Sequence, residues 1–230
     1  MAGVGILARD KSEMDERDDV AETDTGAKVD AATLGEDAAL AVLKNPHISS
    51  DALAQLARSP VAAKSRKVLL GVVEHRRTPR HVSIPLLRRM FTFDLVRLTM
   101  TSTIPADIKR AAEEQIIARM ESLPTGQKIS LARQASGRIA AELLQEADVR
   151  VVSPALENPQ LTEALVVQAL MKKDAPEQLF ILVSNHGKWS LRREVQIALL
   201  RSEKTPRERA QEFAKSFSEE FLRSIVREKP

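Results

Sequence analysis

Basic side chains are concentrated in two intervals of the chain. Arg58–Arg89 holds nine Lys or Arg residues and one acid, Glu74, a net charge of +8 over 32 residues. Lys188–Arg209 holds seven basic residues and three acids. Guanidinium and ammonium groups bind carboxylate and phosphate oxygens through charge-assisted hydrogen bonds. These residues therefore favour recognition of an anionic partner.

The two basic intervals are expected to share one edge of the fold. Superposing the local repeats around them places Arg76, Arg77 and Arg80 opposite Arg201, Lys204 and Arg207. A continuous basic edge attracts polyanions in a salt-dependent way. We therefore predict a partner-binding edge made of Arg66, Lys67, Arg76, Arg77, Arg80, Arg88, Arg89, Arg192, Arg193, Arg201, Lys204 and Arg207.

Three interpretations of this basic edge stay open at the sequence level. The cations can be the solvated faces of ordinary helices, they can bind nucleic acid, or they can bind an acidic protein or the chain's own acidic N-terminal segment. Base stacking needs aromatic side chains, and the chain has six Phe, one Trp and no Tyr. This shortage counts against an enzyme that acts on bases. A protein-binding scaffold is the expected function, and nucleic-acid binding through the basic edge is the alternative.

Trp189 is the aromatic residue with two competing interpretations. It precedes Ser190, an expected helix cap. It can pack as a hydrophobic staple against the following turn, or it can anchor a partner, because tryptophan is enriched at interface hot spots.

Residues that could carry catalysis or bind a metal or cofactor are scarce. There is no Cys, and none of the four His residues has another His four positions away. The Pro124–Lys128 segment, PTGQK, lacks the preceding Gly and the Lys-Ser/Thr pair of a phosphate loop. We therefore expect no enzyme activity, no cofactor and no metal.

Composition divides the chain into two parts. Residues 1–37 carry four basic and eleven acidic groups and few large apolar residues, so we predict a disordered acidic tail. Residues 38–230 carry a net charge of +10 and are predicted to form one helical domain. Since no uncharged run is long enough to span a membrane and no secretory signal is recognisable, we expect a soluble cytoplasmic protein.

The helical domain contains a degenerate repeat. Ala155–Met171 reads as an aliphatic pair, a polar gap, Pro or a Ser/Thr cap, and then an amphipathic helix. Caps and prolines of this kind predict about a dozen short helices, stacked so that each hides its apolar stripe against its neighbours. Related segments are Val42–Ala57, Val72–Leu87, Leu98–Ala112 and Leu199–Ala214.

This pattern resembles the HEAT/armadillo superfamily, and its NPxxT punctuation is similar to the leucine-rich-repeat-variant branch. The resemblance implies an all-α solenoid that binds partners on one face without catalysis. Uneven spacing of the prolines leaves an irregular multi-helix bundle as the alternative fold. DNA glycosylases with HEAT-like repeats suggest an enzyme, but they use Trp and Tyr residues around a catalytic Asp. This chain has one Trp, no Tyr, and no Asp near that Trp in the sequence. The positions that carry the match are Leu156, Asn158, Pro159, Thr162, Leu165, Val166 and Leu170.

Overall fold

The computed structural model describes residues 35–227, with side chains described up to Ile225. Within this range the chain is all-α, as predicted, with no β-strand. Residues 1–34 of the predicted acidic tail lie outside the described residues. The helices are α1 (Glu36–Leu43), α2 (Ser50–Arg58), α3 (Pro60–Lys64), α4 (Arg66–Glu74), α5 (Arg80–Leu87), α6 (Thr92–Met100), α7 (Ala106–Arg119), a 3-10 turn (Met120–Ser122), α8 (Thr125–Gln134), α9 (Gly137–Leu143), α10 (Val149–Leu156), α11 (Glu163–Leu170), α12 (Glu177–Asn185), α13 (Arg193–Arg201), α14 (Arg207–Ala214) and α15 (Glu219–Arg227).

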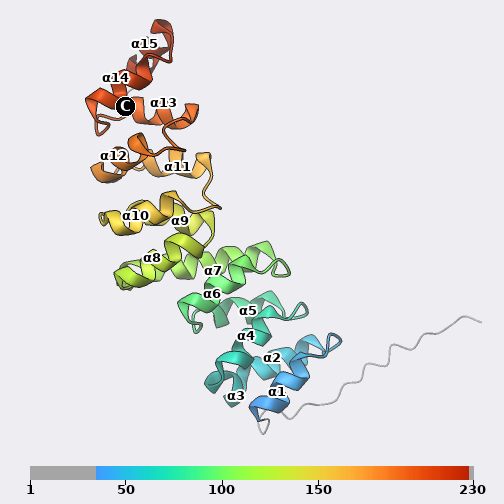
Figure 1. Ribbon diagram of the computed structural model, residues 1–230. Coiled ribbons are helices and arrows are strands. Elements are labelled where there is room, and N and C mark those ends of the chain that lie inside the picture. The colour runs from blue at the N-terminus through green and yellow to red at the C-terminus, as the bar shows by residue number, and fades with distance from the viewer. Residues whose placement is uncertain (1–34, 228–230) are drawn as a thin grey trace, which may run out of the picture.

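The helices follow one another along an elongated stack, from α1 at one end to α15 at the other (Figure 1). In one column α2, α5, α7, α9, α11, α13 and α15 each pack on the next. In the other, α1 packs on α4, and α8 and α12 pack on α10. Short linkers reverse the chain between columns, so each helix covers its apolar side with neighbours in sequence. The core is correspondingly aliphatic, made mainly of Leu, Val, Ile and Ala.

Because the helices alternate in direction, successive linkers lie alternately on two edges of the stack, and hydrogen bonds between neighbouring layers are formed along both edges. On the first edge, His75 Nε2 lies 3.2 Å from the main-chain oxygen of Asn45, and Trp189 Nε1 donates to the main-chain oxygen of Leu156 (2.8 Å). On the second, Arg119 donates to the Met90 oxygen (2.6 Å). The first edge comprises linkers 45–49, 75–79, 101–105, 135–136, 158–162 and 186–192, and the second comprises 59–65, 88–91, 120–124, 144–148, 171–176 and 202–206.

Five linkers form the same side-chain turn. The first linker residue accepts a hydrogen bond from the main-chain N–H two positions later, which fixes the turn that reverses the chain. Asn, His and Ser all perform this role, at 2.8–3.2 Å. The accepting and donating residues are Asn45 and His47, His75 and Arg77, Asn158 and Gln160, His186 and Lys188, and Ser202 and Lys204.

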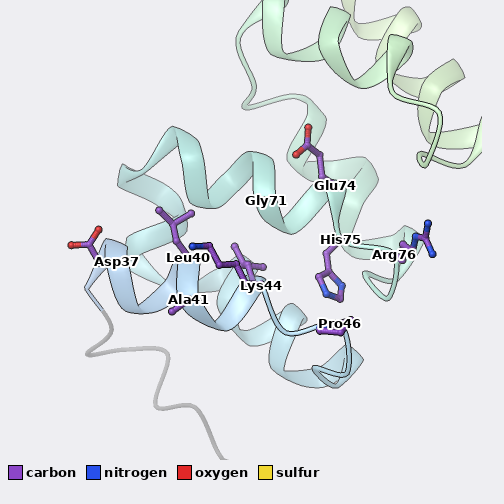
Figure 2. Close-up of a pocket in the computed structure, with 10 residues that line it drawn as sticks. Asp37, Leu40, Ala41, Lys44, Pro46, Gly71, Glu74, His75 and Arg76 are labelled. Carbon is purple, nitrogen blue, oxygen red and sulfur yellow. The ribbon is translucent and has the colours of Figure 1, made fainter.

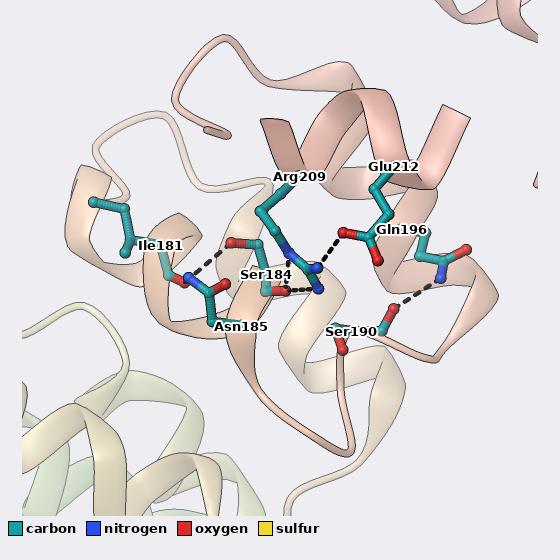
Figure 3. A network of polar contacts seen from close by, with 7 residues as sticks. All are labelled: Ile181, Ser184, Asn185, Ser190, Gln196, Arg209 and Glu212. Atoms are coloured by element: carbon teal, nitrogen blue, oxygen red, sulfur yellow. Dashed lines mark hydrogen bonds and ion pairs between the residues drawn. The ribbon is translucent and has the colours of Figure 1, made fainter. Parts of the chain in front are cut away.

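The last layers are joined by a polar cluster around Arg209 (Figure 3). Its guanidinium, in the first turn of α14, donates to the Ser184 oxygen in α12 and pairs with Glu212. In the same region, the Gln196 amide of α13 donates to the Ser190 oxygen (2.8 Å). Arg209 therefore joins α14 to the end of α12, and Gln196 joins α13 to the linker between α12 and α13.

Local expectations hold unevenly. The run Phe91–Leu98 has a strand-like composition, but the neighbouring repeat signals predict a helix beginning at Thr92 or Asp94, and α6 begins at Thr92. Pro85 predicts a kink or a break near Ile84, and there is no break, since α5 continues through Pro85 to Leu87. The pair Thr78 and Pro79 predicts a Thr78 cap, but the Thr78 hydroxyl donates to the Val72 main-chain oxygen (2.6 Å) and Pro79 occupies the cap position of α5.

Candidate functional site

The expected single basic edge is divided between the two edges. Arg76, Arg77 and Arg80 lie in or next to linker 75–79 on the first edge, and Arg192 and Arg193 lie at the end of linker 186–192 on the same edge. The cluster that was superposed on the first three, Arg201, Lys204 and Arg207, flanks linker 202–206 on the second edge. Each helix runs in the opposite direction to the one before it. An alignment of two repeats that is shifted by one helix therefore pairs residues of one edge with residues of the other.

Most first-edge cations are used within the stack. Arg77 Nη1 donates to the His47 oxygen (3.0 Å), and Arg80 pairs with Asp107 (2.9 Å). The Arg193 guanidinium lies 5.3 Å from the centre of the Phe217 ring. These contacts join consecutive layers, so they give the first-edge cations a structural role. All five of these arginines are exposed, and Arg76 and Arg192 make no such contact within the described residues.

At the far end of the second edge, Lys204 is also engaged. Its Nζ donates to the Ala175 oxygen and lies 5.8 Å from the centre of the Phe180 ring. Arg201 and Arg207 are exposed next to it. The predicted cations at this end therefore surround one lysine that ties linker 202–206 to linker 171–176.

The second-edge patch is a group of exposed cations and phenylalanines where α4 and α6 begin. It comprises linker residues 88–91 together with residues from the first turns of the two helices. The Arg66 guanidinium lies 5.2 Å from the centre of the Phe91 ring, which brings the two helix starts together. The members of the patch are Arg66, Lys67, Arg88, Arg89, Phe91 and Phe93.

Arg66 holds this patch in place through a carboxylate beneath it. Its Nε and Nη2 donate to the two oxygens of Asp94, both at 2.7 Å, a bidentate pair. Asp94 is only 5% exposed. The hydrogen bonds and charge of Asp94 raise the pKa of the Arg66 guanidinium above its ordinary value. Arg66 is therefore a positioning group that fixes the start of α6 against α4.

The remaining cations of the patch face solvent. Lys67, Arg88 and Arg89 are exposed, and among residues 35–225 no side chain pairs with their ammonium or guanidinium groups. The main-chain oxygen of Arg88 accepts from the Arg119 guanidinium (2.7 Å). Phe91 is 64% exposed and Phe93 is 40% exposed. Large exposed apolar groups beside charges are typical of interaction surfaces. The patch thus combines three cations available for ligands with two accessible aromatic rings.

Sequence reasoning found four of these residues and missed the two phenylalanines. The sequence pattern could have indicated that both rings are exposed. Phe91 precedes α6, and Phe93 is one position away from the inward-facing Asp94. Burial of Leu95 and Leu98 defines the inner face of α6, which leaves Phe93 off that face.

Trp189 is a core residue. It is 1% exposed, and its indole N–H donates to the Leu156 oxygen at 2.8 Å. The Lys188 ammonium lies 4.0 Å from the centre of its ring and covers it. Trp189 is therefore a buried structural residue and is not presented to a partner. It is not a staple next to a Ser190 cap, because α13 begins at Arg193 and the indole bonds to the end of α10.

A groove of about 690 Å³ lies between α1 and α4, with His75 and Arg76 at its first-edge end (Figure 2). Its lining mixes apolar groups such as Leu40 with charged ones such as Lys44. Within the described residues, no three His, Asp or Glu side chains are grouped to hold a metal ion. None of the helices described is both long and apolar enough to cross a bilayer.

No protein-family model, no curated protein and no solved structure matches this chain.

Proposed function

We propose that this chain is a non-enzymatic helical-repeat scaffold, with HEAT-like stacking, that binds an acidic protein segment on its second-edge patch. The observation that carries the proposal is the pairing of exposed Lys67, Arg88 and Arg89 with exposed Phe91 and Phe93 on a stack of short helices. Stacked helical repeats present rigid, extended binding surfaces.

The patch suits a partner that carries both carboxylates and an apolar side chain. Arg88 and Arg89 offer planar guanidinium groups that bind carboxylates in a bidentate manner. Phe91 offers a ring that can bury against an aromatic or aliphatic residue of the partner. Exposed charge pairs contribute roughly 0.2–1 kcal/mol each, so the apolar contact is needed for more than weak attraction.

Binding of single-stranded nucleic acid is the second candidate, and Phe91 and Phe93 favour it because they can stack on bases. The distribution of cations counts against it. Arg77, Arg80 and Lys204 are engaged within the stack, and the clusters lie on two edges, so the patch offers a short anion site instead of a long track.

The test compares two probes on the full chain, a labelled glutamate-rich peptide with one central phenylalanine and an oligothymidylate. We expect the peptide to bind and the triple variant Lys67→Ser, Arg88→Ser, Arg89→Ser to weaken it at least about tenfold. Peptide binding should also weaken between about 50 and about 200 mM salt.

The matched control removes three exposed arginines from the first edge: Arg76→Ser, Arg133→Ser and Arg192→Ser. Both variants lose the same net charge, so a nonspecific charge effect would weaken binding equally in both. Equal weakening contradicts a localised patch. Tighter binding of the oligonucleotide, lost only in the patch variant, would establish the nucleic-acid candidate instead.

A further inference from the structure

The second-edge patch has a ligand of matching chemistry in its own chain. Residues 10–24, DKSEMDERDDVAETD, hold eight acids and two basic residues. We propose that this segment binds the second-edge patch within the same molecule and competes there with the acidic partner. The inference rests on the proposed function of the patch and adds a regulation to it.

Charge complementarity is the first argument. The patch presents Lys67, Arg88 and Arg89 without acidic partners in the described residues, and the nearby carboxylate of Asp94 is already paired with Arg66. Lys64, exposed at the end of α3, adds one more cation on the same edge. Carboxylates of residues 10–24 would therefore meet positive groups that the fold leaves unneutralised.

The entry point of the chain is the second argument. The chain enters α1 at Gly35, and α1 ends on the first edge, where the Asn45 oxygen meets His75. The start of α1 consequently lies at the second edge. Figure 2 shows α1 beside α4, with Asp37 at the end away from His75. The acidic segment thus joins the fold beside the helix whose first residues are Arg66 and Lys67.

The chain between the acidic segment and Gly35 is long enough for the segment to reach the second-edge patch. Residues 25–34 connect the acidic segment to Gly35, and extended chain spans about 3.3 Å per residue, or roughly 30 Å here. Packed helices are about 8–10 Å apart, so the patch is within reach. A short tether gives an effective concentration on the order of millimolar, at which weak charge pairing is enough for occupancy.

Carbodiimide coupling of the full chain tests the contact directly, because it joins carboxylates to lysine amines that touch them. We expect Lys64 and Lys67 to couple to residues 10–24 within the monomer, and we expect this product to be lost at high salt. Lys188, exposed on the first edge, is the internal control. Coupling at Lys188 equal to that at Lys67, or coupling only between molecules, overturns the proposal.

A second measurement separates this inference from the proposed function. All eight acids of residues 10–24 are changed to Asn or Gln in the full chain, and binding of the glutamate-rich peptide is measured again. We expect about tenfold tighter binding than to the unchanged chain. Unchanged affinity, with the Lys67, Arg88 and Arg89 variant still weakened, rejects the intramolecular contact and keeps the patch. Loss of any patch effect rejects the proposed function itself.

Discussion

The buried side-chain amide of Asn158 donates to the main-chain oxygen of Ala135 at 3.0 Å, tying the linker before α11 to the end of α8. The same Nδ2 also donates to the Ala132 oxygen (2.8 Å), while Oδ1 accepts from the Gln160 N–H (2.8 Å). Asn158 is 1% exposed, so no solvent can replace these bonds. One asparagine therefore closes its own turn and caps the C-terminal end of α8 in the neighbouring layer.

Replacing Asn158 with Ala should destabilise the fold by about 2–4 kcal/mol, because buried polar groups left unpaired cost roughly 1–3 kcal/mol each. Asn158→Asp should be at least as damaging, since it places a carboxylate against two carbonyl oxygens. Urea unfolding followed by circular dichroism measures both. Asn185→Ala removes an exposed amide that bonds only within α12 and is the control. Equal effects at Asn158 and Asn185 would contradict the bridging role.

His75 and Asn should be interchangeable in the first-edge turn. His75 Nδ1 accepts from the Arg77 N–H (3.2 Å), and Nε2 faces the Asn45 oxygen, which can only accept, so the proton is on Nε2. The side-chain amide of Asn158 makes the same two kinds of bond: Oδ1 accepts from a main-chain N–H two positions later, and Nδ2 donates to a main-chain oxygen of the neighbouring layer. We expect His75→Asn to stay within about 0.5 kcal/mol of the unchanged chain and His75→Ala to lose about 1 kcal/mol, by urea unfolding. An Asn variant as unstable as the Ala variant would refute the equivalence.

Trp189 should report on unfolding and resist substitution. Trp189→Ala removes a fully buried ring and should cost about 3–5 kcal/mol. Trp189→Phe keeps most of the volume but leaves the Leu156 oxygen without its donor, and a loss of about 1–3 kcal/mol is expected. As the single tryptophan, it should fluoresce at short wavelength in the folded chain and shift to longer wavelength in urea. A long-wavelength emission in the folded chain would contradict its burial.

Arg66 and Asp94 should be strongly coupled. Arg66→Ala leaves the nearly buried Asp94 carboxylate without its bidentate partner, and we expect a lower free energy of unfolding. Adding Asp94→Ala removes that unpaired charge, so the double variant should be less unstable than the sum of the single variants. A double-mutant cycle by chemical unfolding measures the coupling. Strict additivity would show that the pair does not act as a unit.

The Asp148 carboxylate should titrate below an ordinary aspartate. Hydrogen bonds from the Arg150 side chain and main chain lower its pKa. A lowered folded-state pKa contributes stability above the unfolded value of about 4, and this contribution is lost as the pH falls through the folded value. Titration of the carboxyl carbon by NMR measures the pKa, and Arg150→Gln should raise it. An unchanged titration in that variant would contradict the cause.

Much of the local structure could be predicted from the sequence. Ser and Thr caps, linker prolines and aliphatic spacing identified short helices, since these signals act within a few residues. The repeat segments containing Asn45, His75 and Asn158 correspond to linkers of one edge. A break between helices was also expected near His186, but its segment was not recognised as a repeat, because it contains Gly187 and Trp189 and no proline.

The sequence by itself determined that this chain is helical, aliphatic in its core and divided between an acidic segment and a basic body. Only the tertiary structure decided which side chains share an edge. Lys204 and Arg76 lie on different edges because of the number of times that the chain reverses between them. A count that is wrong by one helix places them on the same edge. The burial of Trp189 and the exposure of Phe91 were likewise decided by which neighbouring layer covers each ring, and residue type and spacing do not specify that contact.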